Sequence, residues 1–91
     1  MMPVEMIIQE VEKICKKHGI EHLILIGSFA TGVATKTSDV DFALKGGKVT
    51  MELLDEVSNI QTLRKIDIVE YDSCKNSLLL EDIDKYGKQI Y

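Results

Sequence analysis

The chain carries the stretch Gly27-Ser28-Phe29-Ala30-Thr31-Gly32, followed after a short polar turn by Ser38-Asp39-Val40-Asp41-Phe42-Ala43-Leu44. The apolar run before Gly27 predicts a buried strand that ends at the Gly-Ser turn. In the second stretch, apolar and polar residues alternate. This predicts a strand with its apolar side chains on one face and Asp39 and Asp41 on the other. A strand, a glycine turn and a strand with two carboxylates therefore form the centre of the predicted fold.

Outward from this centre, hydrophobic periodicity and capping residues predict the remaining elements. The expected elements are a helix over Pro3–His18, a strand over Ile20–Ile26, a short helix over Phe29–Val33 capped by Ser28, a strand over Val40–Leu44, a helix capped by Thr50 and running to about Leu63, a strand over Ile66–Tyr71, and a helix from Asn76 or Ser77 to Tyr86. We expect a single domain over 1–91 of class α+β, in which a small mixed sheet has its helices packed on one face.

Composition narrows the classes of function. Hydrophobic residues form 45% of the 91-residue chain and charged residues 29%, which is typical of a soluble globular domain. The net charge of −4 argues against direct nucleic-acid binding, because that function needs a basic surface. The strand over Ile20–Ile26 is far too short to span a membrane. The two cysteines, Cys15 and Cys74, lack metal-ligand spacing, so we expect a reduced, cytoplasmic setting. A domain this small has no room for a second substrate domain, so a bulky substrate must be a partner or be recognised by one.

The carboxylates are the strongest chemical signal. Two aspartates two positions apart on a strand project from one face about 6–7 Å apart, and a divalent cation between them would relieve their repulsion. Asp67 lies on the next predicted strand, on the opposite face to Ile66 and Ile68. Three oxygen-ligating carboxylates favour Mg²⁺ or Mn²⁺, and two ions about 3.5–4 Å apart suit nucleotidyl transfer. Taken alone, Asp39 has an ordinary structural explanation as the start of a strand and Asp67 as a solvated residue of the outer face, whereas Asp41 is harder to explain structurally because it lies inside the strand.

Two competing motifs are excluded. An EF-hand calcium loop would begin at Asp39, but its later positions hold Ala43, Leu44 and Thr50 instead of an oxygen ligand, a glycine and a glutamate. The Gly27-Ser28 turn is not a P-loop, because no Gly-Lys pair follows it. Gly27 still permits close backbone approach, and the N–H groups and the Ser28 hydroxyl that follow favour an anion such as phosphate. The alternative is an ordinary turn and cap.

Other polar and aromatic residues carry weaker signals. His18 and His22 have no acidic or cysteine partner at metal or triad spacing, so we expect structural roles for both. Tyr71, Tyr86 and Tyr91 are candidates for a nucleotide-stacking or partner-docking surface, with ordinary packing as the alternative.

The paired motif Gly27-Ser28-Phe29-Ala30-x-Gly32 and Ser38-Asp39-x-Asp41 resembles the signature of the DNA polymerase beta-like nucleotidyltransferase superfamily. In size the chain resembles a minimal nucleotidyltransferase, the antitoxin of HEPN/MNT toxin–antitoxin pairs. The resemblance implies that Gly27 and Ser28 hold the triphosphate of ATP, and that Asp39 and Asp41 bind Mg²⁺. It also implies that Asp67 is the third carboxylate, which binds metal or accepts a proton. The family often has Arg before the second glycine, whereas this chain has Thr31.

The resemblance further implies a Mg²⁺-dependent protein adenylyltransferase. It would transfer AMP to a tyrosine of a HEPN-domain toxin, within a hetero-oligomer, and so act as an antitoxin. The alternative is a non-catalytic antitoxin module that binds its partner through a surface and keeps only a vestigial metal–nucleotide site. Nucleotidylation of a small molecule is a third, weaker reading, because such relatives carry an additional substrate domain.

Overall fold

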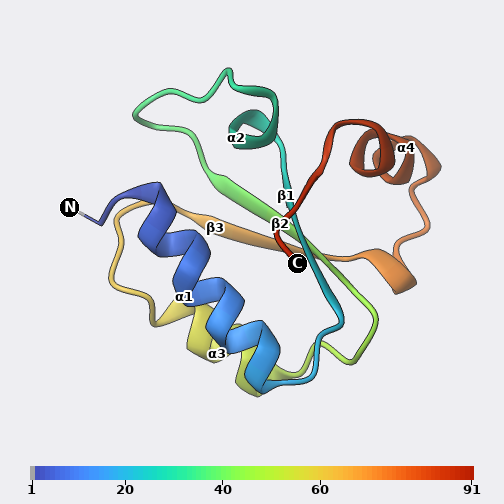
Figure 1. Cartoon of the computed structure of the whole chain (residues 1–91), viewed down its shortest axis with the longest axis horizontal. Helices are drawn as coiled ribbons and strands as arrows, with labels where there is room; N and C mark the ends of the chain where they lie inside the picture. Colours follow the sequence, from blue (N-terminus) through green and yellow to red (C-terminus); the bar gives the residue numbers. More distant parts are fainter. Residues whose placement is uncertain (1) are drawn as a thin grey trace.

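The computed structural model describes residues 2–91 (Figure 1). Along the chain the elements are α1 Val4–Lys17, β1 His22–Ile26, α2 Ser28–Thr31, β2 Val40–Lys45, α3 Met51–Ser58, β3 Ile66–Glu70, the 3-10 turn η1 Tyr71–Ser73, α4 Ser77–Tyr86 and β4 Lys88–Gln89. The strands form one sheet in the order β3-β2-β1-β4. β1 pairs antiparallel with β2 and β4, whereas β2 and β3 run parallel with α3 between them in the chain. The predicted α+β class with a mixed sheet is therefore confirmed.

One face of the sheet carries the main core. The alternating apolar residues of β2, Val40, Phe42 and Leu44, point to this face and are almost fully buried. They pack with residues of α1 and α3 whose three- and four-residue spacing sets one apolar side of each helix: Ile7, Val11, Cys15, Leu53 and Val57. The predicted periodicity of the first helix is borne out, and Cys15 is a core residue. Burial raises the pKa of its thiol to about 11.

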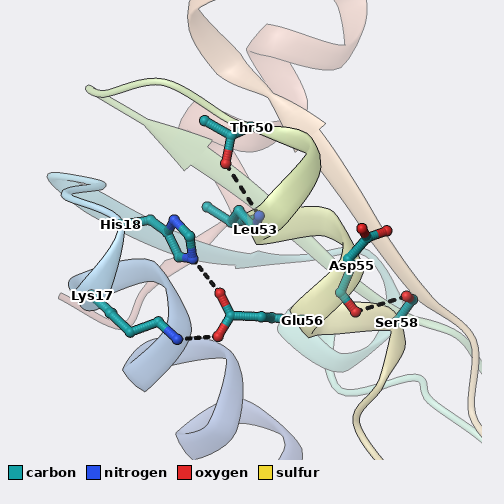
Figure 2. Close-up of polar contacts among 7 residues, drawn as sticks. All are labelled: Lys17, His18, Thr50, Leu53, Asp55, Glu56 and Ser58. Carbon is teal, nitrogen blue, oxygen red and sulfur yellow. Dashed lines mark hydrogen bonds and ion pairs between the residues drawn. The ribbon is translucent and has the colours of Figure 1, made fainter.

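Polar contacts join the two helices on that face (Figure 2). Lys17 Nζ and His18 Nε2, at the end of α1, contact the two carboxylate oxygens of Glu56 in α3. These contacts lower the pKa of Glu56 below its usual value, with Lys17 as the larger cause. The Thr50 hydroxyl accepts a hydrogen bond from the Leu53 N–H at 3.2 Å, which caps α3 as the sequence predicted.

The opposite face of the sheet is covered by α4, and here the expectation that all helices share one face is wrong. Ile83 of α4 packs on Ile26 and Ala43, with Leu79 beside them. Figure 1 shows α4 across the sheet from α1 and α3. The reason is that β1 is apolar on both faces, since Leu23 and Leu25 serve the main core while Ile24 and Ile26 serve this second cluster.

Smaller differences concern the element ends. Ser28 does not cap the short helix; Gly27 is the residue before it and Ser28 its first residue. α3 ends at Ser58, well before Leu63, because the Ser58 hydroxyl bonds back to the Asp55 carbonyl and a polar segment follows. After the last expected helix the chain forms a further short strand, β4, which pairs with Ile24 and Leu25 of β1. Within residues 2–91, no helix is both long and apolar enough to cross a membrane.

Candidate active site

The turn after β1 brings the backbone against an aspartate of β2. Gly27 has φ 72° and ψ −152°, a conformation that only glycine adopts without strain. A Cβ at this position would lie 2.5 Å from Asp41 Oδ2. The absence of a side chain therefore lets the Asp41 carboxylate lie directly beside the turn. The two halves of the sequence motif meet at this contact.

Asp41 also lies beside Asp67, because the two residues are register partners on the parallel strands β2 and β3. Burial raises the pKa of Asp41 above its usual value, and the Asp67 carboxylate raises it further. The charge of Asp39 acts in the same direction, while Lys65 opposes it. Lys65 Nζ lies 3.6 Å from Asp67 Oδ1 at the exposed edge of the site. Two neighbouring carboxylates with this electrostatic cost mark a candidate cation site.

Asp39 has a different setting from the other two aspartates. It is exposed and precedes the first residue of β2, at the end of the loop that leaves α2. Arg64 holds this loop, since its guanidinium donates to the carbonyls of Ser38 at 2.9 Å and Thr35 at 3.3 Å. The same guanidinium lies 5.1 Å from the centre of the Phe29 ring. Sequence reasoning missed Arg64, because nothing in its local pattern indicates a contact with a loop so distant in the chain.

A cavity of about 570 Å³ opens beside the contact between Gly27 and Asp41. Its polar lining comes mainly from the predicted motifs: Gly27, Ser28, Thr31, Asp41 and Asp67. Its apolar lining comes from the strands, the loop after α2 and helix α4: Ile26, Val33, Val69, Leu79, Ile83 and Tyr86. Asp82 and Gly87 complete the lining. The structure thus gathers four of the five predicted site residues, and Asp39 lies outside the lining. In α4 the sequence offered Tyr86 as a candidate, but the contributions of Leu79, Asp82 and Ile83 were missed because their spacing indicates an ordinary amphipathic helix.

The cavity lining is acidic, which affects the binding of an anion such as phosphate. Asp41, Asp67 and Asp82 line it, and among the described residues no Lys, Arg or His does so. Thr31, at the position often held by Arg in the resembled family, turns its hydroxyl back toward the Gly27 and Ser28 carbonyls at 3.4 and 3.5 Å. A polyanion would therefore meet net repulsion here unless a cation came with it.

The donor set suits a hard divalent cation. Asp41 and Asp67 offer carboxylate oxygens only, which are the ligands that Mg²⁺ prefers, and a cation beside them would relieve the repulsion that raises the pKa of Asp41. Over residues 2–91, no group of three or more His, Cys, Asp or Glu side chains is placed so that it could hold a metal ion, so the structure does not gather the expected set of three carboxylates. Mg²⁺ often keeps several water ligands and shares substrate phosphates, so a two-carboxylate platform is chemically adequate.

Comparison with known proteins agrees with this geometry. Residues 9–91 match the family described as polymerase beta, nucleotidyltransferase. The chain belongs to this family of nucleotidyltransferase domains. No curated protein is significantly similar to it in sequence.

Three solved structures share the fold, all described as toxin–antitoxin structures. A crystal structure of a toxin–antitoxin with AMP-PNP has a TM-score of 0.75 and 20% identity, covering 91% of this chain and 71% of that chain. A mutant of the toxin–antitoxin MntA-HpeT with two aspartate-to-glutamate changes has a TM-score of 0.72 and 18% identity, with the same coverage. A second MntA-HpeT mutant has a TM-score of 0.70 and 21% identity, covering 100% of this chain and 73% of that chain. At these identities the likeness establishes the fold.

Proposed function

We propose that this chain transfers AMP from ATP to a tyrosine hydroxyl of a partner toxin of the HEPN class, and so acts as an antitoxin. The observation that carries the proposal is the meeting of Gly27 with Asp41 in a cavity that Ser28 and Asp67 also line. Family membership supports nucleotidyl transfer as the chemistry. The structural neighbours are toxin–antitoxin proteins, one of them with the ATP analogue AMP-PNP, which supports a toxin as partner and ATP as the nucleotide.

In this proposal the triphosphate lies against the Gly27-Ser28 turn, where the backbone is open and the Ser28 hydroxyl can donate. Asp41 and Asp67 would hold the magnesium that the nucleotide requires, whereas Asp39 precedes β2 and lies outside the cavity lining. When bound, Mg²⁺ neutralises phosphate charge and stabilises the charge that develops on the attacking and leaving oxygens. Because no basic side chain lines the cavity over the described residues, ATP binding should depend strongly on this cation.

The transfer is a single displacement at the α-phosphorus. The tyrosine oxygen of the partner forms a bond to that phosphorus while the bond to the bridging oxygen of the β-phosphate breaks, and pyrophosphate leaves. The proton of the tyrosine passes to a carboxylate of the site, for which Asp67 is the candidate because it lies at the exposed edge of the pair. The products are an AMP-tyrosine phosphodiester and pyrophosphate.

The acceptor in this proposal is a partner protein. Its tyrosine must reach the cavity that the strands, the Gly27 turn and α4 line. We expect a hetero-oligomer of this chain and the toxin in the cytoplasm. The protein encoded beside this chain is the first acceptor to try.

The direct test incubates the chain with ATP labelled at the α-phosphate, Mg²⁺ and the candidate toxin. Label should pass to the toxin with the native chain and be lost with Asp41→Asn or when Mg²⁺ is chelated. Absence of label on the toxin with the native chain would refute the transfer.

A second candidate function is supported by Thr31 and by the acidic lining. Without a basic side chain in the cavity, the site would be a relic and the chain would neutralise its partner by binding alone. The two functions differ in one respect. Asp41→Ala should abolish neutralisation of toxicity if AMP transfer is the mechanism, and leave it intact if binding is sufficient.

A further inference from the structure

The apolar wall of the cavity is not needed for phosphate chemistry. Leu79, Ile83 and Tyr86 of α4 form this wall, and the glycine turn, Asp41 and Asp67 lie in the rest of the lining. Tyr86 keeps 51% of its surface exposed although it adjoins an apolar cavity. A nucleotide has the matching form, with a charged triphosphate at one end and a flat, largely apolar base at the other. Aromatic side chains are common platforms for such bases.

Several contacts fix α4, so this wall is a formed part of the cavity. The Asn76 side chain caps the helix by accepting from the Leu79 N–H at 3.2 Å. The Tyr71 hydroxyl donates to Asp84 at 2.8 Å and ties the helix to the end of β3. At the other end, Gly87 approaches so closely that a Cβ would lie 2.7 Å from Ile24 Cγ2 and 2.5 Å from the Ile83 carbonyl oxygen. Tyr86 is therefore presented from an anchored helix end.

Asp82 is the polar group on this wall. Its carboxylate lines the cavity, and within the described residues it makes no hydrogen bond or ion pair. A carboxylate accepts hydrogen bonds and cannot donate them. The Asp82 carboxylate also repels phosphate. It therefore favours a nucleotide orientation in which the triphosphate lies at the Gly27 turn, away from α4. Beside an aromatic platform, its best partner is an amino group on the edge of a base.

We infer that α4 is the base-recognition element of this site: the Tyr86 ring stacks on the purine of the nucleotide, and Asp82 accepts a hydrogen bond from the exocyclic amino group of adenine. The inference rests on the proposed nucleotide-transfer function and adds the residues that select the base. In this arrangement, specificity comes from a helix that the phosphate and metal motifs do not include.

The test measures binding of two Mg²⁺-nucleotides that differ only in the amino group: ATP and purine riboside triphosphate. The native chain should bind ATP about three- to tenfold more tightly, which corresponds to one solvent-accessible hydrogen bond. Asp82→Asn should reduce that preference, because its amide presents a donor as well as an acceptor. The matched control is Glu81→Gln, which removes an acidic group on the same helix that does not line this cavity.

The stacking part is tested with Tyr86→Ala and Tyr86→Phe. Loss of the ring in Tyr86→Ala should weaken the binding of both nucleotides by about tenfold. Tyr86→Phe should recover most of that affinity, because the ring remains. Because Tyr86 is half exposed at the end of α4, we expect both variants to fold, and circular dichroism melts verify this.

The outcomes separate this inference from the proposed function. If the native chain binds and transfers ATP but Tyr86→Ala and Asp82→Asn leave both affinity and base preference unchanged, α4 has no part in base recognition and the inference is overturned. If the native chain binds neither nucleotide in the presence of Mg²⁺, the proposed function and the inference both fail.

Discussion

Asp41 lies against the α-carbon of Gly27, so closely that a methyl group on that carbon would stand 2.5 Å from Asp41 Oδ2. Two motifs separated by a helix and a loop are thereby joined into one surface. A glycine is required there for two independent reasons: the positive φ of 72° and the proximity of the carboxylate.

Replacing Gly27 with alanine should damage both stability and the site. We expect Gly27→Ala to lower the free energy of unfolding by about 1–3 kcal/mol through backbone strain, and to displace the Asp41 carboxylate. Urea unfolding and Mg²⁺-dependent ATP binding measure the two effects. Gly32→Ala is the matched control, because Gly32 also has a positive φ, of 80°, but a Cβ there meets nothing within 4 Å. Equal loss of ATP binding in both variants would contradict the role given to the Gly27–Asp41 contact.

Asp41→Asn should separate stability from activity. Since the ionised Asp41 is disfavoured by burial and by Asp67, a neutral amide should stabilise the fold at pH 7, by a few tenths of a kcal/mol because the site is partly solvated. AMP transfer should fall by roughly a hundredfold or more. Urea titrations at pH 7 and in acid measure the stability effect, which should shrink as pH falls through the raised pKa of folded Asp41 and vanish well below the unfolded-state pKa of about 3.9. A loss of stability at pH 7 would contradict this electrostatic account.

The Glu56 contacts predict a pH dependence of folding. Lys17 and His18 lower the pKa of Glu56, so its stabilising contribution is fully present above its unfolded-state pKa and is lost as pH falls through the lowered folded-state value. The free energies of unfolding of the native chain and of Glu56→Gln should therefore differ most near neutral pH. The difference should begin to shrink near the unfolded-state pKa of about 4.3 and disappear below the lowered folded-state value. Asp55→Asn is the control, since it removes an exposed charge from the same helix that forms no ion pair in the described residues. If the difference in unfolding free energy between the native chain and Glu56→Gln stayed constant from neutral to acid pH, the role of the Glu56 charge would be refuted.

Thr31→Arg should strengthen nucleotide binding. Thr31 lines a cavity that has three aspartates and, over the described residues, no basic side chain. A guanidinium there would offer charge-assisted hydrogen bonds to phosphate. We expect Mg²⁺-ATP affinity to rise several-fold by calorimetry, whereas Thr31→Gln, which has similar bulk and no charge, should leave it nearly unchanged. An equal gain from Gln would show that charge is not what the position lacks.

The sequence predicted those features that depend on local pattern. The alternation in β2 placed Val40, Phe42 and Leu44 in the core, and the caps at Thr50 and Asn76 began α3 and α4 as expected. The glycine turn and the aspartates were identified from residue type and spacing, and the structure brings Gly27, Ser28, Asp41 and Asp67 to one cavity.

Features that depend on tertiary packing could not be predicted from the local sequence pattern. The amphipathic pattern of α4 does not state which face of the sheet it covers; that follows from the second apolar face of β1, Ile24 and Ile26. The short strand β4 exists because Gly87 lets the chain turn back beside β1, and its two residues carry no strand signal of their own. The contacts of Arg64 and the place of Asp82 in the cavity lining depend on residues distant in the sequence.

The central claim is most directly tested by the mass of the partner toxin purified after co-expression with this chain. We predict that the toxin gains one or more AMP groups on a tyrosine with the native chain, and gains none with Asp41→Asn. An unmodified toxin that the native chain nevertheless neutralises would contradict the account, and would favour a protein that acts by binding alone.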